Sequence, residues 1–147
     1  MGYRAPETEE LMAPNIVDVY TTLEATLSTE LATETRKGFP DWARSQAVLP
    51  VVAVELFGVG NPNVTRMGQS LALVDFVVRV WLFGSSEPEL GGLLDGLVSF
   101  LNKYAKLDVP GGSVRLSLVN GERHTPETAA QQERHAFWIN IMVRNSA

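Results

Sequence analysis

The chain has 147 residues, a net charge of -5 and no cysteine. A domain of this length buries about two-thirds of the surface that its unfolded chain exposes, so a core forms without covalent cross-links. The absence of cysteine excludes disulfides, thiolate metal sites and a cysteine nucleophile, and two histidines are too few for a His-rich metal site. No apolar run is long enough to span a membrane, so we expect a soluble, unprocessed protein.

The acidic charge is concentrated at the start of the chain. Up to Glu34 there are seven acidic residues against one basic residue, Arg4, whereas the remainder holds eleven basic and ten acidic residues. The arginines are scattered, and none lies in a basic cluster interleaved with aromatic residues. This distribution disfavours direct nucleic-acid binding.

Residues 1–14 are polar, contain two prolines and show no periodicity, so we expect a flexible N-terminal arm. Both a disordered tail and an arm that becomes ordered on a partner are compatible with this composition. Residues 15–147 are expected to form one α+β domain. Its first element is an amphipathic helix that starts at the N-cap residue Asn15 and continues to about Arg36. Its apolar positions follow helical spacing: Ile16, Val19, Tyr20, Leu23, Leu27 and Leu31.

Two long strands are predicted next, joined by a protruding loop. Residues 48–57 alternate as a first strand, although Pro50 indicates either a sheet edge or a strand that begins after it. Residues 58–69 are rich in turn formers and predict a loop. Residues 70–83 predict the central strand, because branched and aromatic residues alternate without interruption by glycine or proline. One face of that strand is wholly apolar, and the other carries two charges, so we expect another element or subunit to cover it.

A second helix is predicted from Ser86, which acts as N-cap, with Glu89 as its capping-box partner. Three glycines weaken the helical propensity of this segment, and we expect them to let the helix lie close against the sheet: Gly91, Gly92 and Gly96. Residues 113–118 then predict a third strand. A second polar loop is expected from Asn120 to Glu133, followed by a last strand from Arg134 to Arg144.

The predicted order is therefore helix, strand, strand, helix, strand, strand. We expect an α+β fold with a mostly antiparallel four-stranded sheet and both helices on one face. Two helices cover only one side of such a sheet, so apolar side chains would be exposed on the other side. This favours association of subunits through that face.

Catalytic motifs are missing from the sequence. The glycines at positions 58 and 60 lack the lysine of a phosphate-binding loop. We interpret His124 as a solvated loop residue rather than a catalytic base, and His135 as an inward residue at the start of a strand. Asp75 and Arg79 share a face of the central strand and are interpreted as a structural or intersubunit pair rather than a catalytic one. We expect no enzymatic activity, no metal and no cofactor.

The layout resembles a known family across residues 15–144. The segments that carry the resemblance are LPVVAVELFG, LVDFVVRVWLFGSS, EPELGGLLDGLVSFL and HAFWINIMVRN, placed after an amphipathic opening helix. In this order they resemble the tail terminator, or tail-completion, proteins of long-tailed bacteriophages and related phage-like particles. The family is marked by the order of its elements rather than by invariant chemistry.

The resemblance implies a structural virion protein that forms a hexameric ring. Such a ring caps the tail tube, ends its polymerisation and joins it to the head connector, with no active site. The implied partners are other copies of the chain, the tail tube protein and the connector (stopper) protein, while DNA passes through the lumen without specific binding. The implied location is the neck of the virion, where tail and head join, and the bacterial cytoplasm during assembly.

Two groups of residues are implied as contacts. The subunit interface would use the outer face of the sheet at Leu73, Asp75, Val77, Arg79, Trp81 and Trp138. Contacts with the tube or connector would use the two long loops at Asn61, Asn63, Arg66, Met67, Glu122, Arg123 and His124. Two alternatives stay open: another ring component of the connector, such as a stopper or minor tail protein, and a small-molecule-binding module with a pocket between helices and sheet.

Overall fold

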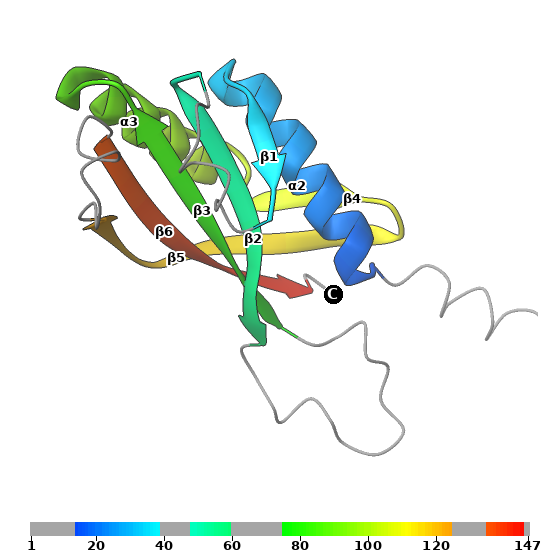
Figure 1. Cartoon of the computed structure of the whole chain (residues 1–147). Coiled ribbons are helices and arrows are strands. Elements are labelled where there is room, and N and C mark those ends of the chain that lie inside the picture. Colours follow the sequence, from blue (N-terminus) through cyan, green and yellow to red (C-terminus); the bar gives the residue numbers. More distant parts are fainter. Residues whose placement is uncertain (1–13, 39–47, 60–74, 125–134, 146–147) are drawn as a thin grey trace, which may run out of the picture.

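The computed structural model describes residues 14–38, 48–59, 75–124 and 135–145. The described residues form a six-stranded sheet with two helices packed on one of its faces (Figure 1). In chain order the elements are α2 (Ile16–Leu31), β1 (Thr35–Lys37), β2 (Val51–Val59), β3 (Phe76–Gly84), α3 (Glu87–Lys103), β4 (Lys106–Val109), β5 (Gly112–His124) and β6 (His135–Asn145).

The sheet is mixed and curled. Its strand order is β1-β2-β3-β6-β5-β4, in which β1 runs parallel to β2 and every other neighbouring pair is antiparallel. The two edge strands, β1 and β4, both contact α2, so the sheet curls around this helix as a half-barrel (Figure 1). The prediction of a mostly antiparallel four-stranded sheet in the order α-β-β-α-β-β was therefore wrong, because it missed both edge strands.

The first missed strand, β1, lies where the opening helix was predicted to continue to Arg36. The helix ends at Leu31 because Ala32 adopts a left-handed conformation, with φ 49°, and its N–H contacts the carbonyl oxygens of the last turn. Beyond it, Thr33 and Thr35 are β-branched residues that favour extended backbone. Three residues suffice for pairing with β2, where Thr35 lies opposite Val52.

The second missed strand, β4, forms a hairpin with β5. Val109 pairs with Gly112, so the connection is the two-residue turn Pro110-Gly111, in which Gly111 has φ 90°. Proline followed by a glycine with positive φ fits a type II turn. The fifth strand also runs further than predicted. Residues 120–124 pair with β6 and belong to β5, so the second polar loop does not begin at Asn120.

The central position of β3 is confirmed. This strand lies between β2 and β6, and Val78, Val80 and Leu82 face the helices, as the alternation predicted. On that face the core receives side chains from both helices and from every strand except β1. Its largest fully buried members are Phe100, Leu23, Leu27, Leu82, Leu97 and Ile141.

Both helix starts are as predicted. The Asp18 N–H donates to Asn15 Oδ1 at 2.8 Å, and the Glu89 N–H donates to Ser86 Oγ at 3.3 Å. Pro50 immediately precedes β2, as expected for a strand that starts after it. The glycines of α3 differ from expectation, because Gly91 and Gly92 face open space and Gly96 contacts Leu31 of α2 rather than the sheet.

The close approach of α3 to the sheet occurs at Gly84. A Cβ atom at this position would lie 2.9 Å from the backbone nitrogen of Leu90. We therefore expect Gly84→Ala to lower the free energy of unfolding by about 1–3 kcal/mol, because α3 must shift away from β3. Urea unfolding followed by circular dichroism measures this loss.

Gly92→Ala is the matched control, because it adds the same methyl group within α3 where nothing lies within 4 Å. It is expected to raise the free energy of unfolding by up to about 1 kcal/mol through helical propensity. Equal effects of the two variants would show that space at Gly84 does not limit the packing of α3.

Candidate functional site

The face of the sheet opposite the helices, here called the outer face, carries a row of polar residues across four strands. Glu55 of β2 lies opposite Arg79 of β3, Arg79 lies opposite Asn140 of β6, and Asn140 lies opposite Asn120 of β5. Cross-strand neighbours on one face of a sheet are close enough for direct contact. The row therefore concentrates hydrogen-bonding groups in the middle of the outer face.

Arg79 lies between two aromatic rings. Its guanidinium carbon is 3.8 Å from the centroid of Phe57 and 3.9 Å from that of Trp138. The Nε–H donates to Asn140 Oδ1 at 2.9 Å, and Asn140 Nδ2 donates to Asn120 Oδ1 at 3.0 Å. We call these five residues the Arg79 cluster. Cation–π contact on both faces and a hydrogen bond at Nε hold the guanidinium plane in one orientation.

The Arg79 cluster contains a cation to which no described acid is bound. Among the described residues no carboxylate forms an ion pair with Arg79. Its opposite neighbour Glu55 instead accepts a hydrogen bond from Trp81 Nε1 at 2.7 Å. Partial burial lowers the pKa of Arg79, and the charge of Glu55 acts in the opposite direction. The cluster is thus partly desolvated and can accept a carboxylate.

Trp81 lies on the outer face, as the alternation predicted, but it is buried within the chain rather than exposed. Its side chain is only 6% exposed and belongs to a small second core on the outer face. It stacks on Phe83 with ring centroids 6.2 Å apart, and His124 meets it edge-on at 5.4 Å. A buried ring satisfied by Glu55 contributes to folding rather than to an exposed contact. His124 accordingly lies in β5 against Trp81, not in a solvated loop.

Of the other predicted interface residues, some lie on the outer face and one lies outside the described residues. Val77 and Trp138 lie on the outer face and are partly buried. Within one copy Asp75 pairs with Arg144 instead of Arg79, since Asp75 Oδ2 lies 3.4 Å from Arg144 Nε, and a pair between copies stays a prediction. Leu73 lies outside the described residues. So do four predicted loop contacts, which are Asn61, Asn63, Arg66 and Met67.

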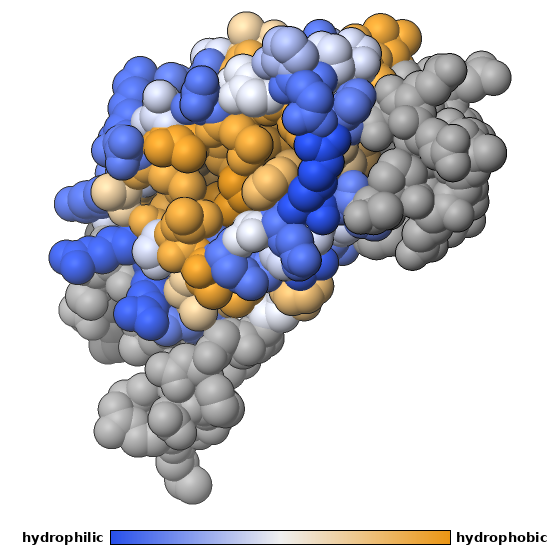
Figure 2. Space-filling model, turned by 90° about the vertical axis from the view of Figure 1, so that its left-hand side faces the viewer, coloured by the Kyte–Doolittle hydropathy of each residue, from blue (hydrophilic) through white to orange (hydrophobic). Residues whose placement is uncertain are grey.

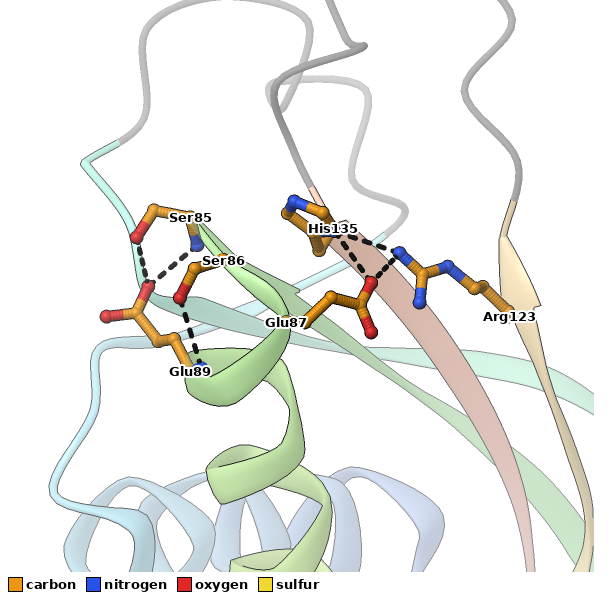
Figure 3. A network of polar contacts seen from close by, with 6 residues as sticks. All are labelled: Ser85, Ser86, Glu87, Glu89, Arg123 and His135. Atoms are coloured by element: carbon orange, nitrogen blue, oxygen red, sulfur yellow. Dashed lines mark hydrogen bonds and ion pairs between the residues drawn. The ribbon is translucent and has the colours of Figure 1, made fainter.

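The predicted loop residues Glu122 and Arg123 lie in β5, and Arg123 belongs to a second polar network (Figure 3). Arg123 and Glu87 form an ion pair, and His135 Nδ1 lies 2.9 Å from both Glu87 Oε1 and Arg123 Nη2. These residues come from the ends of α3, β5 and β6. Beside them, the Ser85 N–H and hydroxyl donate to Glu89 Oε1 at 2.7 and 2.8 Å. The network ties the start of α3 to the sheet.

In the part of the chain that the structure describes, no group of three His, Cys, Asp or Glu side chains is arranged to hold a metal ion. An arginine flanked by tryptophan and phenylalanine is instead typical of the energetic centres of protein–protein interfaces.

A second surface lies between α3 and β5. Figure 2 shows apolar side chains gathered in a hollow with polar side chains along its borders. The apolar side chains exposed on these two elements are Val98 at 50%, Leu118 at 57% and Val119 at 53%. Because β4 pairs only with residues 112–115, the rest of β5 has no strand along its other edge among the described residues. We call this surface the α3–β5 hollow.

No described helix is both long and apolar enough to cross a membrane.

Comparison with known proteins identifies a fold but no family. No protein-family model matches the chain, and no curated protein sequence matches it. Among solved structures it is similar to a chain of the virion of a native gene transfer agent particle, with 12% identity over 88% of this chain and 92% of that chain and a TM-score of 0.50. It is also similar to the sheath/tube terminator of an extracellular contractile injection system in its extended state. That match has 13% identity over 92% of this chain and 58% of that chain, with a TM-score of 0.51. The chain therefore has a fold found in components of phage-like particles.

Sequence reasoning identified Arg79 and Trp138 as outer-face residues but missed their arrangement. Alternation placed both on the outer face, yet the contact with Phe57 depends on a β-bulge at that residue, where the register between β2 and β3 shifts. Asn140 and Asn120 were not selected at all. The sequence did carry a signal for Asn140, because this amide interrupts an otherwise apolar run in β6. In the structure it is buried, and a buried amide needs hydrogen-bond partners.

The Glu87 network predicts a pH-dependent contribution to stability. The hydrogen bond from Arg123 lowers the pKa of Glu87 below its ordinary value of 4.5, with a smaller contribution from His135. A carboxyl group with a lowered pKa in the folded state stabilises the protein above its unfolded-state pKa, and this contribution is lost as the pH falls through the folded-state value. Glu87→Gln should therefore lower the melting temperature at pH 7, and the difference from wild type should shrink as the pH is lowered below about 4.

Thermal unfolding of both proteins at each pH measures this difference. Glu122→Gln is the control, because Glu122 is an exposed acid next to Arg123 that has no recorded partner among the described residues. It should leave the melting temperature unchanged across the same range. A Glu87→Gln effect that persists undiminished at pH 3 would contradict an electrostatic role.

Proposed function

We propose that this chain is a structural protein of a phage-like particle whose copies form a ring on the end of the tail tube. The ring would stop polymerisation of the tube and join it to the head connector. Support comes from the fold shared with a gene transfer agent virion chain and with a sheath/tube terminator. The resemblance of the sequence to tail terminators supports the same role. The proposal includes six copies per ring, no catalytic activity and no cofactor.

The observation that carries this proposal is the outer face. It presents an arginine in contact with a half-exposed phenylalanine and a partly buried tryptophan, and the two described helices lie on the opposite face. Such a face is suited to contact with another protein. The net charge of -5 is compatible with a lumen that DNA crosses without binding, because like charges repel. The neck of the virion is the proposed location, after assembly in the bacterial cytoplasm.

A closed ring of more than two copies needs two different surfaces on each copy. Each contact in such a ring is heterologous, so one surface of a subunit meets another surface of the next. The described residues offer two candidates, the outer face and the α3–β5 hollow, and these lie on different sides of the sheet. We propose that the outer face of one copy contacts the hollow of its neighbour.

The ring itself is tested by native mass spectrometry of the purified chain, alone and mixed with assembled tail tubes. We expect either a hexamer in solution or a monomer that becomes a six-copy cap on the tubes. A monomer that neither assembles nor binds tubes would overturn the proposal. A ring that binds the connector but ignores tubes would indicate a stopper instead.

The two surfaces are tested by a mixing experiment with Val77→Asp on the outer face and Leu118→Asp in the hollow. Each variant alone should fail to form rings, because a buried, unpaired charge disfavours the contact. A mixture of the two should form heterodimers and stop there, since one Val77→Asp subunit and one Leu118→Asp subunit retain a single intact contact between them.

Val17→Asp is the control, because Val17 is an exposed residue of α2 on neither surface. It should assemble like wild type. Sedimentation velocity measures the species, and circular dichroism verifies that each variant is folded. Rings formed by either single variant would contradict the assignment of that surface.

A further inference from the structure

The charge of Arg79 lacks an ion-pair partner within the described chain, and the described residues offer one candidate acid on another copy. Most described acids are already engaged. Lys37 lies 3.8 Å from Glu24, Lys103 lies 3.2 Å from Glu30, and Arg144 lies 3.4 Å from Asp75. Five further acids pair with basic side chains or accept hydrogen bonds: Asp18, Glu34, Glu55, Glu87 and Glu89.

Three acids of the described residues have no recorded hydrogen bond or ion pair, and they are Asp95, Asp108 and Glu122. Glu122 lies opposite Trp138 and so shares the outer face with Arg79. Asp108 also points to that side, because its neighbours Leu107 and Val109 are buried in the core with the helices. Two residues of one face do not meet in a heterologous contact between different faces. Of the acids that the structure describes, this leaves Asp95.

Asp95 lies on α3 at the border of the α3–β5 hollow. It follows the partly buried Leu94 and precedes the half-exposed Val98 by three residues, so it lies next to Val98 on the helix surface. The hollow therefore presents an exposed carboxylate beside aliphatic side chains. The Arg79 cluster presents a cation beside aromatic side chains. The two surfaces are complementary in both charge and apolar character.

We propose that Arg79 of one copy binds the carboxylate of Asp95 of the next copy. This inference rests on the proposed ring and assigns the pair that fixes the register of its subunits. Because Nε is bonded to Asn140, the guanidinium has its two Nη groups left for the incoming carboxylate. The aromatic rings on both sides exclude water from the pair, and this strengthens it relative to an exposed salt bridge.

Charge reversal tests the pair. Arg79→Glu and Asp95→Lys should each raise the concentration needed for half-maximal ring formation by about tenfold or more, in solution or on tail tubes, whichever supports assembly of wild type. The double variant restores an opposite-charge pair and should return this concentration to within about threefold of wild type. Mass photometry across a dilution series measures the ring fraction.

The matched control combines Arg79→Glu with Asp108→Lys, which carries the same net charge but places the lysine on the outer face. It should not recover assembly. A double-mutant cycle of Arg79→Gln and Asp95→Asn tests the same pair if Arg79→Glu does not fold. The double variant should lose no more ring formation than either single variant. Melting temperatures verify that each variant is folded.

The outcomes separate this inference from the proposed function. Failure of the charge-reversed double variant to recover, together with additive losses in the neutral cycle, would overturn the Arg79–Asp95 pair. The ring and its two surfaces would stand if wild type still assembles and the mixing experiment gives heterodimers. Absence of any wild-type ring would overturn both.

Discussion

The structure depends on how its helices cover the sheet: among the described residues, α2 and α3 both pack on one face of the six strands and no helix packs on the other. The covered face is a conventional core of aliphatic and aromatic side chains from both helices and five strands. The other face has to satisfy its described side chains without either of these helices. Near one end it does so with a second small core around Trp81, and in the middle with the polar row that contains Arg79.

The Arg79 cluster satisfies the side chains in the middle of the outer face only in part. Burial of a guanidinium has an electrostatic cost, visible in the lowered pKa of Arg79. Two cation–π contacts contribute about 0.5–2 kcal/mol each, and the bond to Asn140 adds a further stabilising contact. None of these neutralises the charge. An anion from outside the described chain would do so, and for this reason the cluster suits an interface better than it suits a core.

The parts of the fold that were predictable from the sequence are those encoded locally. The alternation of β3 and β6 is read from adjacent residues, and the caps Asn15 and Ser86 act within one helical turn. The edge strand β1 and the second half of β5 were not readable in this way. Thr35–Lys37 pairs only because Ala32 ends α2 early and directs the chain along β2, and residues 120–124 are polar yet extended because β6 lies beside them. Both depend on distant partners, and no local pattern records these partners.

The two β-bulges explain why the candidate surfaces lie where they do. The extra residue in β2 is Phe57, and the extra residue in β5 is Val119; each is a half-exposed apolar side chain. The first bulge brings a ring over Arg79, and the second lies in the part of β5 that extends beyond β4. A residue inserted into a strand is released from the ladder, so it can present a side chain that regular pairing would direct elsewhere. Each β-bulge thus supplies an apolar side chain to one of the two surfaces. The regular pairing of β3 with β2 and β6 places the charge of Arg79 on the outer face.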